Sequence, residues 1–153
     1  MLESFVPALA GLLTTAKAMA SFDSFRKGRK GDVRVLIEEL KENSRLCFRV
    51  VLDDVDCSVV VPKFSTVEFD RLIRSGFNFN AIQSKKIQPV AGIDKTDLVS
   101  WPGKTTTALI VNIYDKIKNL KSVQEFVPES PTRKRRLINI HKRILLLLHH
   151  ANG

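Results

Sequence analysis

The chain contains little cysteine and little histidine, and these absences exclude several kinds of protein. Only two of its 153 residues are cysteines, Cys47 and Cys57, and they do not form a C-x-x-C pair. Two thiols cannot build the disulfide framework of a small secreted domain or a structural zinc site with four ligands. The three histidines have no carboxylate close to them in sequence. We therefore predict no metal site, no cofactor and a reducing, cytoplasmic setting.

A long uninterrupted apolar run is also missing. Residues 1–22 are rich in apolar side chains, but Pro7, Thr14 and Lys17 are among the residues that interrupt them. A membrane-spanning helix needs roughly 20 predominantly apolar residues in succession. A secretory signal begins with positive charge, whereas this chain opens with Met-Leu-Glu and has no Lys or Arg before Lys17. These features favour a cytoplasmic protein whose first helix is unusually apolar.

Catalytic patterns are absent as well. The nearest approach is Gly103-Lys104-Thr105, which resembles the end of a phosphate-binding loop, but Leu98 stands where that loop requires glycine. We therefore predict a protein that is not an enzyme, and no small-molecule substrate is evident from the sequence.

What the sequence does contain is the composition of a globular helical domain. Hydrophobic residues make up 44% of the chain and charged residues 27%, so we expect one domain over residues 1–153. Apolar residues recur at spacings of three and four in five segments, which predicts a mainly α bundle of about five helices. The segments are residues 1–22, 32–55, 65–75, 104–126 and 130–148. We expect the first helix to pack centrally and the basic last helix to lie at the edge.

Helix-capping residues mark several of the expected boundaries. Asp32 is suited to cap the second helix, and Ser130 the last one. Ser65 and Glu68 have the spacing of a capping box, in which each side chain accepts a backbone N–H of the same turn. Gly76 is expected to end the third helix in the left-handed conformation.

Two connections are expected to be irregular. Residues 56–62 are short and β-branched and end at Pro62, which predicts an extended connection. Residues 83–103 form the longest stretch without periodicity, with Trp101 as its expected anchor in the core. A loop of this length is unusual in a compact domain, so it contains a short hidden element near residues 90–93 or has a function of its own.

Positive charge is concentrated near the C-terminus. Of the net charge of +9, +7 belongs to residues 104–153. Six cations fall within the last predicted helix with no acidic residue among them: Arg133, Lys134, Arg135, Arg136, Lys142 and Arg143. We expect the pairs Arg135 with Lys142 and Arg136 with Arg143 to face outward. This pattern predicts a site for phosphate groups of nucleic acid or of an anionic membrane surface, and a simple solvated face is the alternative.

An apolar surface is predicted from the two ends of the chain. The run Leu145-Leu146-Leu147-Leu148 is wider than one helix face, and Leu146 points away from the others on a helical wheel. A monomer would leave it exposed unless the end of the chain inserts between its own helices. The residues predicted to contact a protein partner or a second copy of the chain are Phe5, Leu9, Leu13, Leu145, Leu146 and Leu148.

These two surfaces lead to three hypotheses about function. The first is a non-enzymatic interaction or adaptor module that self-associates or docks a protein partner through the apolar residues. The second is a nucleic-acid-binding protein that uses the basic C-terminal helix. The third is a membrane-active bundle that inserts its apolar N-terminal helix.

Overall fold

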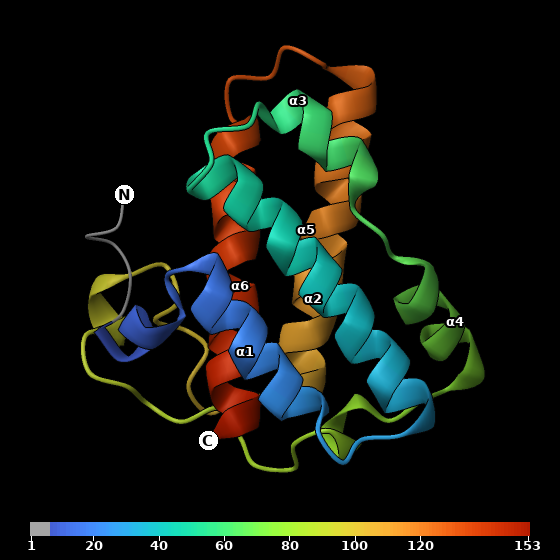
Figure 1. The fold of residues 1–153 in the computed structure, drawn as a ribbon, viewed down its shortest axis with the longest axis vertical. Coiled ribbons are helices and arrows are strands. Elements are labelled where there is room, and N and C mark those ends of the chain that lie inside the picture. The colour runs from blue at the N-terminus through green and yellow to red at the C-terminus, as the bar shows by residue number, and fades with distance from the viewer. Residues whose placement is uncertain (1–6) are drawn as a thin grey trace.

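The protein is a bundle of α-helices (Figure 1), in agreement with the predicted mainly α class. The computed structural model describes residues 7–153, apart from the side chain of Lys95, and these residues form no β-strand. The α-helices are α1 (Thr15–Arg26), α2 (Gly31–Val51), α3 (Cys57–Val60), α4 (Val67–Ser75), α5 (Thr106–Phe126) and α6 (Arg133–Asn152). Short 3-10 helices are η2 (Pro7–Leu12), η3 (Val61–Lys63), η4 (Phe79–Ala81) and η5 (Ile93–Lys95).

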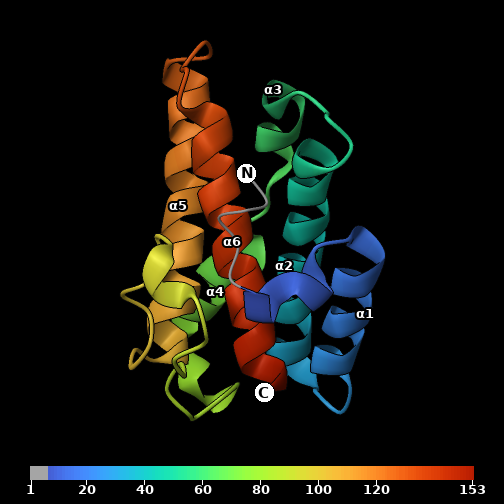
Figure 2. The same cartoon turned by 90° about the vertical axis from the view of Figure 1, so that its left-hand side faces the viewer.

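The last helix, α6, occupies the centre of the bundle. It lies between α5 on one side and α1 and α2 on the other (Figure 2), and η2 packs across its C-terminal end. Every residue from 140 to 148 is buried, so this part of α6 contacts other parts of the protein on all sides. The expectation that the first helix is central and the last one peripheral is therefore wrong.

The predicted first helix is interrupted within its apolar run. Residues Pro7–Leu12 form η2, and α1 begins only after Thr14, whose extended backbone starts a new helix. The Thr14 hydroxyl caps α1 by accepting a hydrogen bond from the backbone N–H of Lys17, at 3.2 Å. Because of this cap, α1 starts later than predicted and continues to Arg26.

Residues 57–63 are helical rather than extended. Asp56 caps α3 because its carboxylate accepts the backbone N–H of Ser58 at 2.8 Å. Pro62 lies in the first turn of η3, where the missing N–H of proline removes no hydrogen bond. The capping carboxylate and the position of the proline thus prevail over the β-branched composition.

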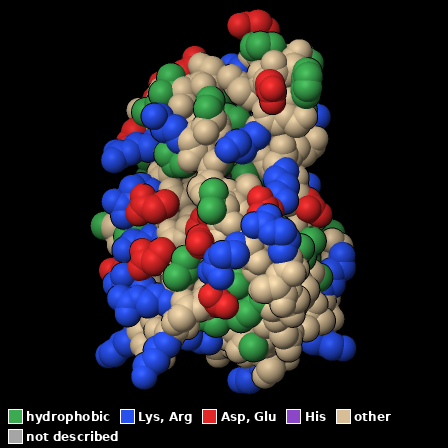
Figure 3. All heavy atoms as spheres, turned by 90° about the vertical axis from the view of Figure 1, so that its right-hand side faces the viewer, with side chains coloured by type: hydrophobic (Ala, Val, Ile, Leu, Met, Phe, Trp, Pro, Cys, Tyr) green, Lys and Arg blue, Asp and Glu red, His purple; other side chains and the backbone are tan. Residues whose placement is uncertain are grey.

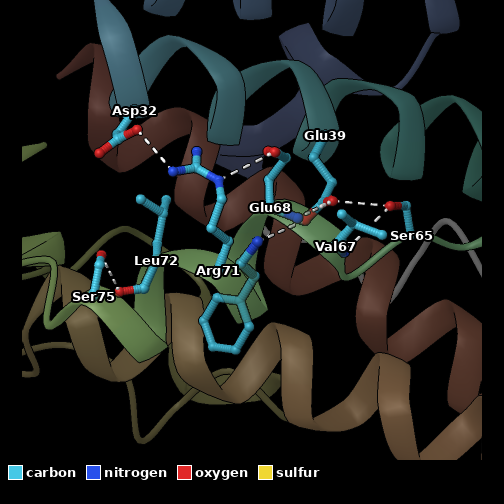
Figure 4. Close-up of polar contacts among 9 residues, drawn as sticks. Asp32, Glu39, Ser65, Val67, Glu68, Arg71, Leu72 and Ser75 are labelled. Atoms are coloured by element: carbon cyan, nitrogen blue, oxygen red, sulfur yellow. Dashed lines mark hydrogen bonds and ion pairs between the residues drawn. The ribbon is translucent and has the colours of Figure 1, made fainter.

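The start of α4 is capped from another helix. The buried carboxylate of Glu39 in α2 accepts the backbone N–H groups of Glu68 at 2.8 Å and Phe69 at 3.2 Å (Figure 4). It also accepts the hydroxyl of Ser65 at 2.9 Å. Ser65 contributes only a long contact of 3.4 Å with the N–H of Val67. The predicted capping box is therefore replaced by a contact that joins α2 to α4.

The remaining helix ends lie close to their predicted positions. Gly76 ends α4 with φ of 75°, as predicted. Thr105 caps α5 by accepting the N–H of Ala108 at 3.1 Å. The residue before α2 is Lys30 rather than Asp32, and the residue before α6 is Thr132 rather than Ser130.

The segment of residues 83–103 is irregular, as predicted, apart from η5. It is held by Trp101, Ile87 and Leu98, which are all buried, so the expected anchor at Trp101 is confirmed. Two backbone hydrogen bonds pin its start to its end: Ile87 donates to Lys104, and Gly103 donates to Ile87. This segment lies beside the lower part of α5 and α6 (Figure 2).

Burial of His141 makes stability depend on pH. His141 is 1% exposed in α6, where its ring meets the edge of Phe48 at a centroid distance of 4.6 Å. Burial lowers the pKa of His141 to about 4, from an ordinary value of 6.5. Between these values the unfolded chain takes up a proton that the folded protein does not, so stability falls as the pH drops.

We expect the free energy of unfolding to fall by about 2.5 kcal/mol because of this histidine when the pH is lowered from about 7.5 to about 4.5. Urea denaturation of the native protein and of His141→Phe at both pH values measures the difference. The variant, which keeps an aromatic ring beside Phe48, should lose that much less stability on acidification. Equal losses in the two proteins would show that His141 does not titrate in this way.

Candidate functional site

The leucines predicted to form an apolar interface belong to the core. Leu9, Leu145 and Leu148 are fully buried, and Leu146 is 1% exposed. They are enclosed because α1, α2, α5 and η2 surround α6. Leu146 is therefore buried within the monomer, as the alternative of insertion between the chain's own helices requires, and it is not exposed. Leu13 is partly buried and packs against the same core. Phe5 lies outside the described residues.

Two of the six predicted phosphate-binding cations are turned inward. Lys142 and Arg143 have side chains that are 10% exposed, and both contact Asp97 of the irregular segment. The distances from Asp97 are 3.4 Å to the ammonium of Lys142 and 3.2 Å to the guanidinium of Arg143. Burial of Asp97 opposes its ionisation, but these two cations outweigh burial and lower the pKa of Asp97. The prediction that Lys142 and Arg143 face outward is therefore wrong.

Arg133 and Lys134 lie at the start of α6, away from the pocket that Arg135 and Arg136 line. The guanidinium of Arg133 donates to the side chain of Gln124 at 2.9 Å and to the backbone oxygen of Pro128. These bonds tie the turn between α5 and α6 to both helices. Arg133 and Lys134 both line a hollow that also includes Asp54 and Asp56, and Arg133 contacts the Asp56 carboxylate at 3.8 Å.

Arg135 and Arg136 meet residues of α5 in a small pocket of about 220 Å³. We call it the basic pocket; its lining residues are Lys116, Asn119, Arg135, Arg136 and Asn139. Three of these side chains are cationic and two are amides, and none of the five carries a carboxylate. Cations and amide N–H groups are the donors that proteins use to bind phosphate oxygens.

Helix geometry places these side chains on one seam. Lys116 and Asn119 are three residues apart on α5, and Arg136 and Asn139 are three apart on α6, so each pair shares a face. The two helices run antiparallel and pack against each other, which brings the faces together (Figure 2). Arg136 is oriented by a hydrogen bond from its Nε to the hydroxyl of Thr132, at 3.0 Å.

The electrostatics of the basic pocket favour an anion. Partial burial lowers the pKa of Lys116, the guanidinium groups of Arg143 and Arg136 lower it further, and Asp97 opposes them. Like charges held together in this way repel one another, and a bound anion would relieve that repulsion. Asp97 already contacts Lys142 and Arg143.

The face of the molecule that carries α4 has a different charge pattern. On the face that carries α4, basic and acidic side chains alternate (Figure 3). Arg71 contacts Asp32 at 3.1 Å and Glu68 at 3.4 Å, and Lys118 contacts Asp70. Arg71 and Lys118 on this face are therefore paired with carboxylates, whereas the basic pocket has no carboxylate among its lining residues.

Sequence reasoning identified Arg135 and Arg136 but missed the contribution of α5. The sequence places Lys116 and Asn119 on one face of the predicted helix. A helical wheel of that helix alone does not show which other helix this face contacts. The basic pocket exists only because α5 and α6 pair.

The described residues offer neither a metal site nor a membrane span. Within residues 7–153 no group of His, Cys, Asp and Glu could hold a metal ion. None of the described helices combines the length and the apolar character that crossing a membrane demands. Comparison with protein-family models, with curated proteins and with solved structures found no match.

Proposed function

We propose that this chain is a non-enzymatic helical domain that binds nucleic acid, with the basic pocket seating a backbone phosphate. The observation that carries the proposal is the convergence of Lys116, Arg135 and Arg136 in a concave site with no carboxylate in its lining. Phosphate contacts supply most of the affinity of non-specific nucleic-acid binding. A cytoplasmic setting, expected from the two free thiols, belongs to the same proposal.

Burial of the leucines favours this function over an adaptor and over binding of a membrane surface through the last helix. Binding to a membrane surface needs cations beside an exposed apolar face that enters the acyl region. The leucines next to the basic segment are at most 1% exposed, so they do not provide that face. The same burial removes Leu9, Leu145, Leu146 and Leu148 from the surface that an adaptor would present.

Fluorescence anisotropy with labelled single-stranded and duplex oligonucleotides tests the proposal. The double variant Arg135→Glu/Arg136→Glu should bind at least about tenfold more weakly than the native protein at about 50 mM salt. The slope of log K against log salt should become shallower by about one, because the pocket no longer neutralises its phosphate. Lys116→Gln, which changes α5 alone, should weaken binding about threefold or more.

A matched control distinguishes binding at the basic pocket from attraction by the net charge of the protein. Lys63→Glu/Arg74→Glu makes the same change in charge at two exposed residues outside the basic pocket, and should bind like the native protein. Equal weakening of both double variants would mean that only the overall charge attracts nucleic acid. The absence of any binding by the native protein would reject the proposal.

A further inference from the structure

A second cavity lies at the C-terminal end of α6, where it faces the first residues of the irregular segment. Its volume is about 430 Å³, within the range of pockets that hold small molecules. Its lining residues are Gln83, Lys85, Lys86, Ile87, Gln88, Val90, Leu146, His149, His150 and Gly153. A helix rises about 1.5 Å per residue, so His149 lies about 20 Å along α6 from Arg136. The cavity is therefore separate from the basic pocket.

One part of this cavity is apolar and fixed in place. Ile87 and Leu146 are buried, and Val90 is partly buried. We call these three residues the apolar floor. Ile87 is held by the two backbone hydrogen bonds that join it to Lys104 and Gly103, and Leu146 belongs to the central helix. The floor is thus formed before any ligand arrives.

A chain of hydrogen bonds fixes the wall between the irregular segment and α6. The Thr106 hydroxyl donates to the backbone oxygen of Gln83 at 2.6 Å. Its oxygen is also 2.8 Å from Nε2 of His150, which acts as the donor because the hydroxyl proton is already used. The side chain of Gln83 in turn donates to the backbone oxygen of His150 at 3.5 Å. These contacts hold the segment against the helix.

The other part of the cavity carries positive charge. Lys85 and Lys86 are exposed at its edge, and we call them the cationic rim. No Asp or Glu is among the lining residues. An apolar floor beside a cationic rim suits a ligand with one apolar part and one anionic part, because each part meets its preferred surroundings.

We propose that this cavity binds a small amphipathic anion, whose carboxylate or phosphate head lies at the cationic rim and whose apolar body covers the floor. This site goes beyond the proposed binding of nucleic acid and does not depend on it. No local pattern in the sequence indicates it, because the lining residues come from two segments about sixty positions apart.

Isothermal titration calorimetry with octanoate and with phenyl phosphate tests this site. Acetate has the carboxylate without the long apolar chain, and octanol has the apolar chain without the anionic group. Octanoate, phenyl phosphate or both should bind at least about tenfold more tightly than acetate and octanol. Lys85→Glu/Lys86→Glu should weaken that binding at least about tenfold, whereas Lys63→Glu/Arg74→Glu should leave it unchanged. Methyl resonances of Ile87, Val90 and Leu146 should shift on binding.

A second variant tests the floor. Val90→Asp places a carboxylate at a partly exposed position of the cavity and should abolish binding, with helix content checked by circular dichroism. The proposal is overturned if neither anion binds. It is also overturned if acetate or octanol binds as tightly as octanoate, or if reversing the charge of the cationic rim has no effect.

Discussion

Replacing Leu146 by alanine should lower the free energy of unfolding by about 2–5 kcal/mol, the cost of a cavity in a packed core. Leu146 is 1% exposed and lies in the helix that the rest of the bundle surrounds. Truncating its side chain removes contacts that the neighbouring helices cannot fully replace. Urea denaturation of native protein and variant under the same conditions gives the difference.

Phe126→Ala is a suitable control for this measurement. Phe126 is 77% exposed at the end of α5, so its truncation should change stability by less than about 0.5 kcal/mol. If Leu146 were an interface residue on a peripheral helix, Leu146→Ala would leave the stability of the monomer unchanged and would weaken self-association. That pattern, measured with light scattering alongside denaturation, would contradict the central position of α6.

Glu39→Ala should destabilise the protein by about 3 kcal/mol and should loosen α4 first. The carboxylate of Glu39 accepts two backbone N–H groups and one hydroxyl at the start of that helix. Its removal leaves two N–H groups without an acceptor, and each buried unsatisfied group costs about 1–3 kcal/mol. Amide hydrogen exchange should therefore accelerate at Glu68 and Phe69 more than in α5 or α6.

The matched control is Glu42→Ala, one turn further along α2. Glu42 is exposed and contacts Arg45 at 3.4 Å, and such surface pairs contribute roughly 0–1 kcal/mol. A similar loss of stability in the two variants, or uniform acceleration of exchange throughout the bundle, would show that Glu39 does not act as the cap of α4.

The helices themselves follow from local patterns in the sequence. Leu109, Ile113, Ile117 and Leu120 recur on one face of α5, and all four are buried as that spacing predicts. Gly76 ends α4 because the helix terminates in the left-handed conformation, which glycine adopts without steric strain. Periodicity and turn chemistry are properties of neighbouring residues, so they can be read from the chain directly.

The arrangement of the helices depends on contacts between distant residues. Ser65 and Glu68 satisfy the local rule for a capping box, but Glu39, more than twenty residues earlier, takes that role. The wheel of the last helix identified its apolar stripe, yet it did not reveal that helices surround α6 and bury Leu145 and Leu146 as well. The number of neighbours of a helix is not encoded in its own periodicity.

The candidate site also has one part that local sequence patterns predict and one part that depends on contacts between distant residues. Arg135 and Arg136 were predicted because they are consecutive cations on one helix. Lys116 joins them through the pairing of α5 with α6, and Asp97 removes Lys142 and Arg143 from the predicted surface through a loop contact. Charge along the sequence therefore located the basic helix, and the packing decided which of its cations share a pocket.

The most direct test of nucleic-acid binding at the basic pocket is a chemical-shift map. Backbone and side-chain amide resonances of the native protein would be followed while a short oligonucleotide is added. We expect the largest changes at Asn119 and Asn139 and at the backbone amides of Lys116, Arg135 and Arg136. Changes that fall instead on the α4 face or on residues 83–90, or no changes under low salt, would contradict the assignment of this pocket as the phosphate site.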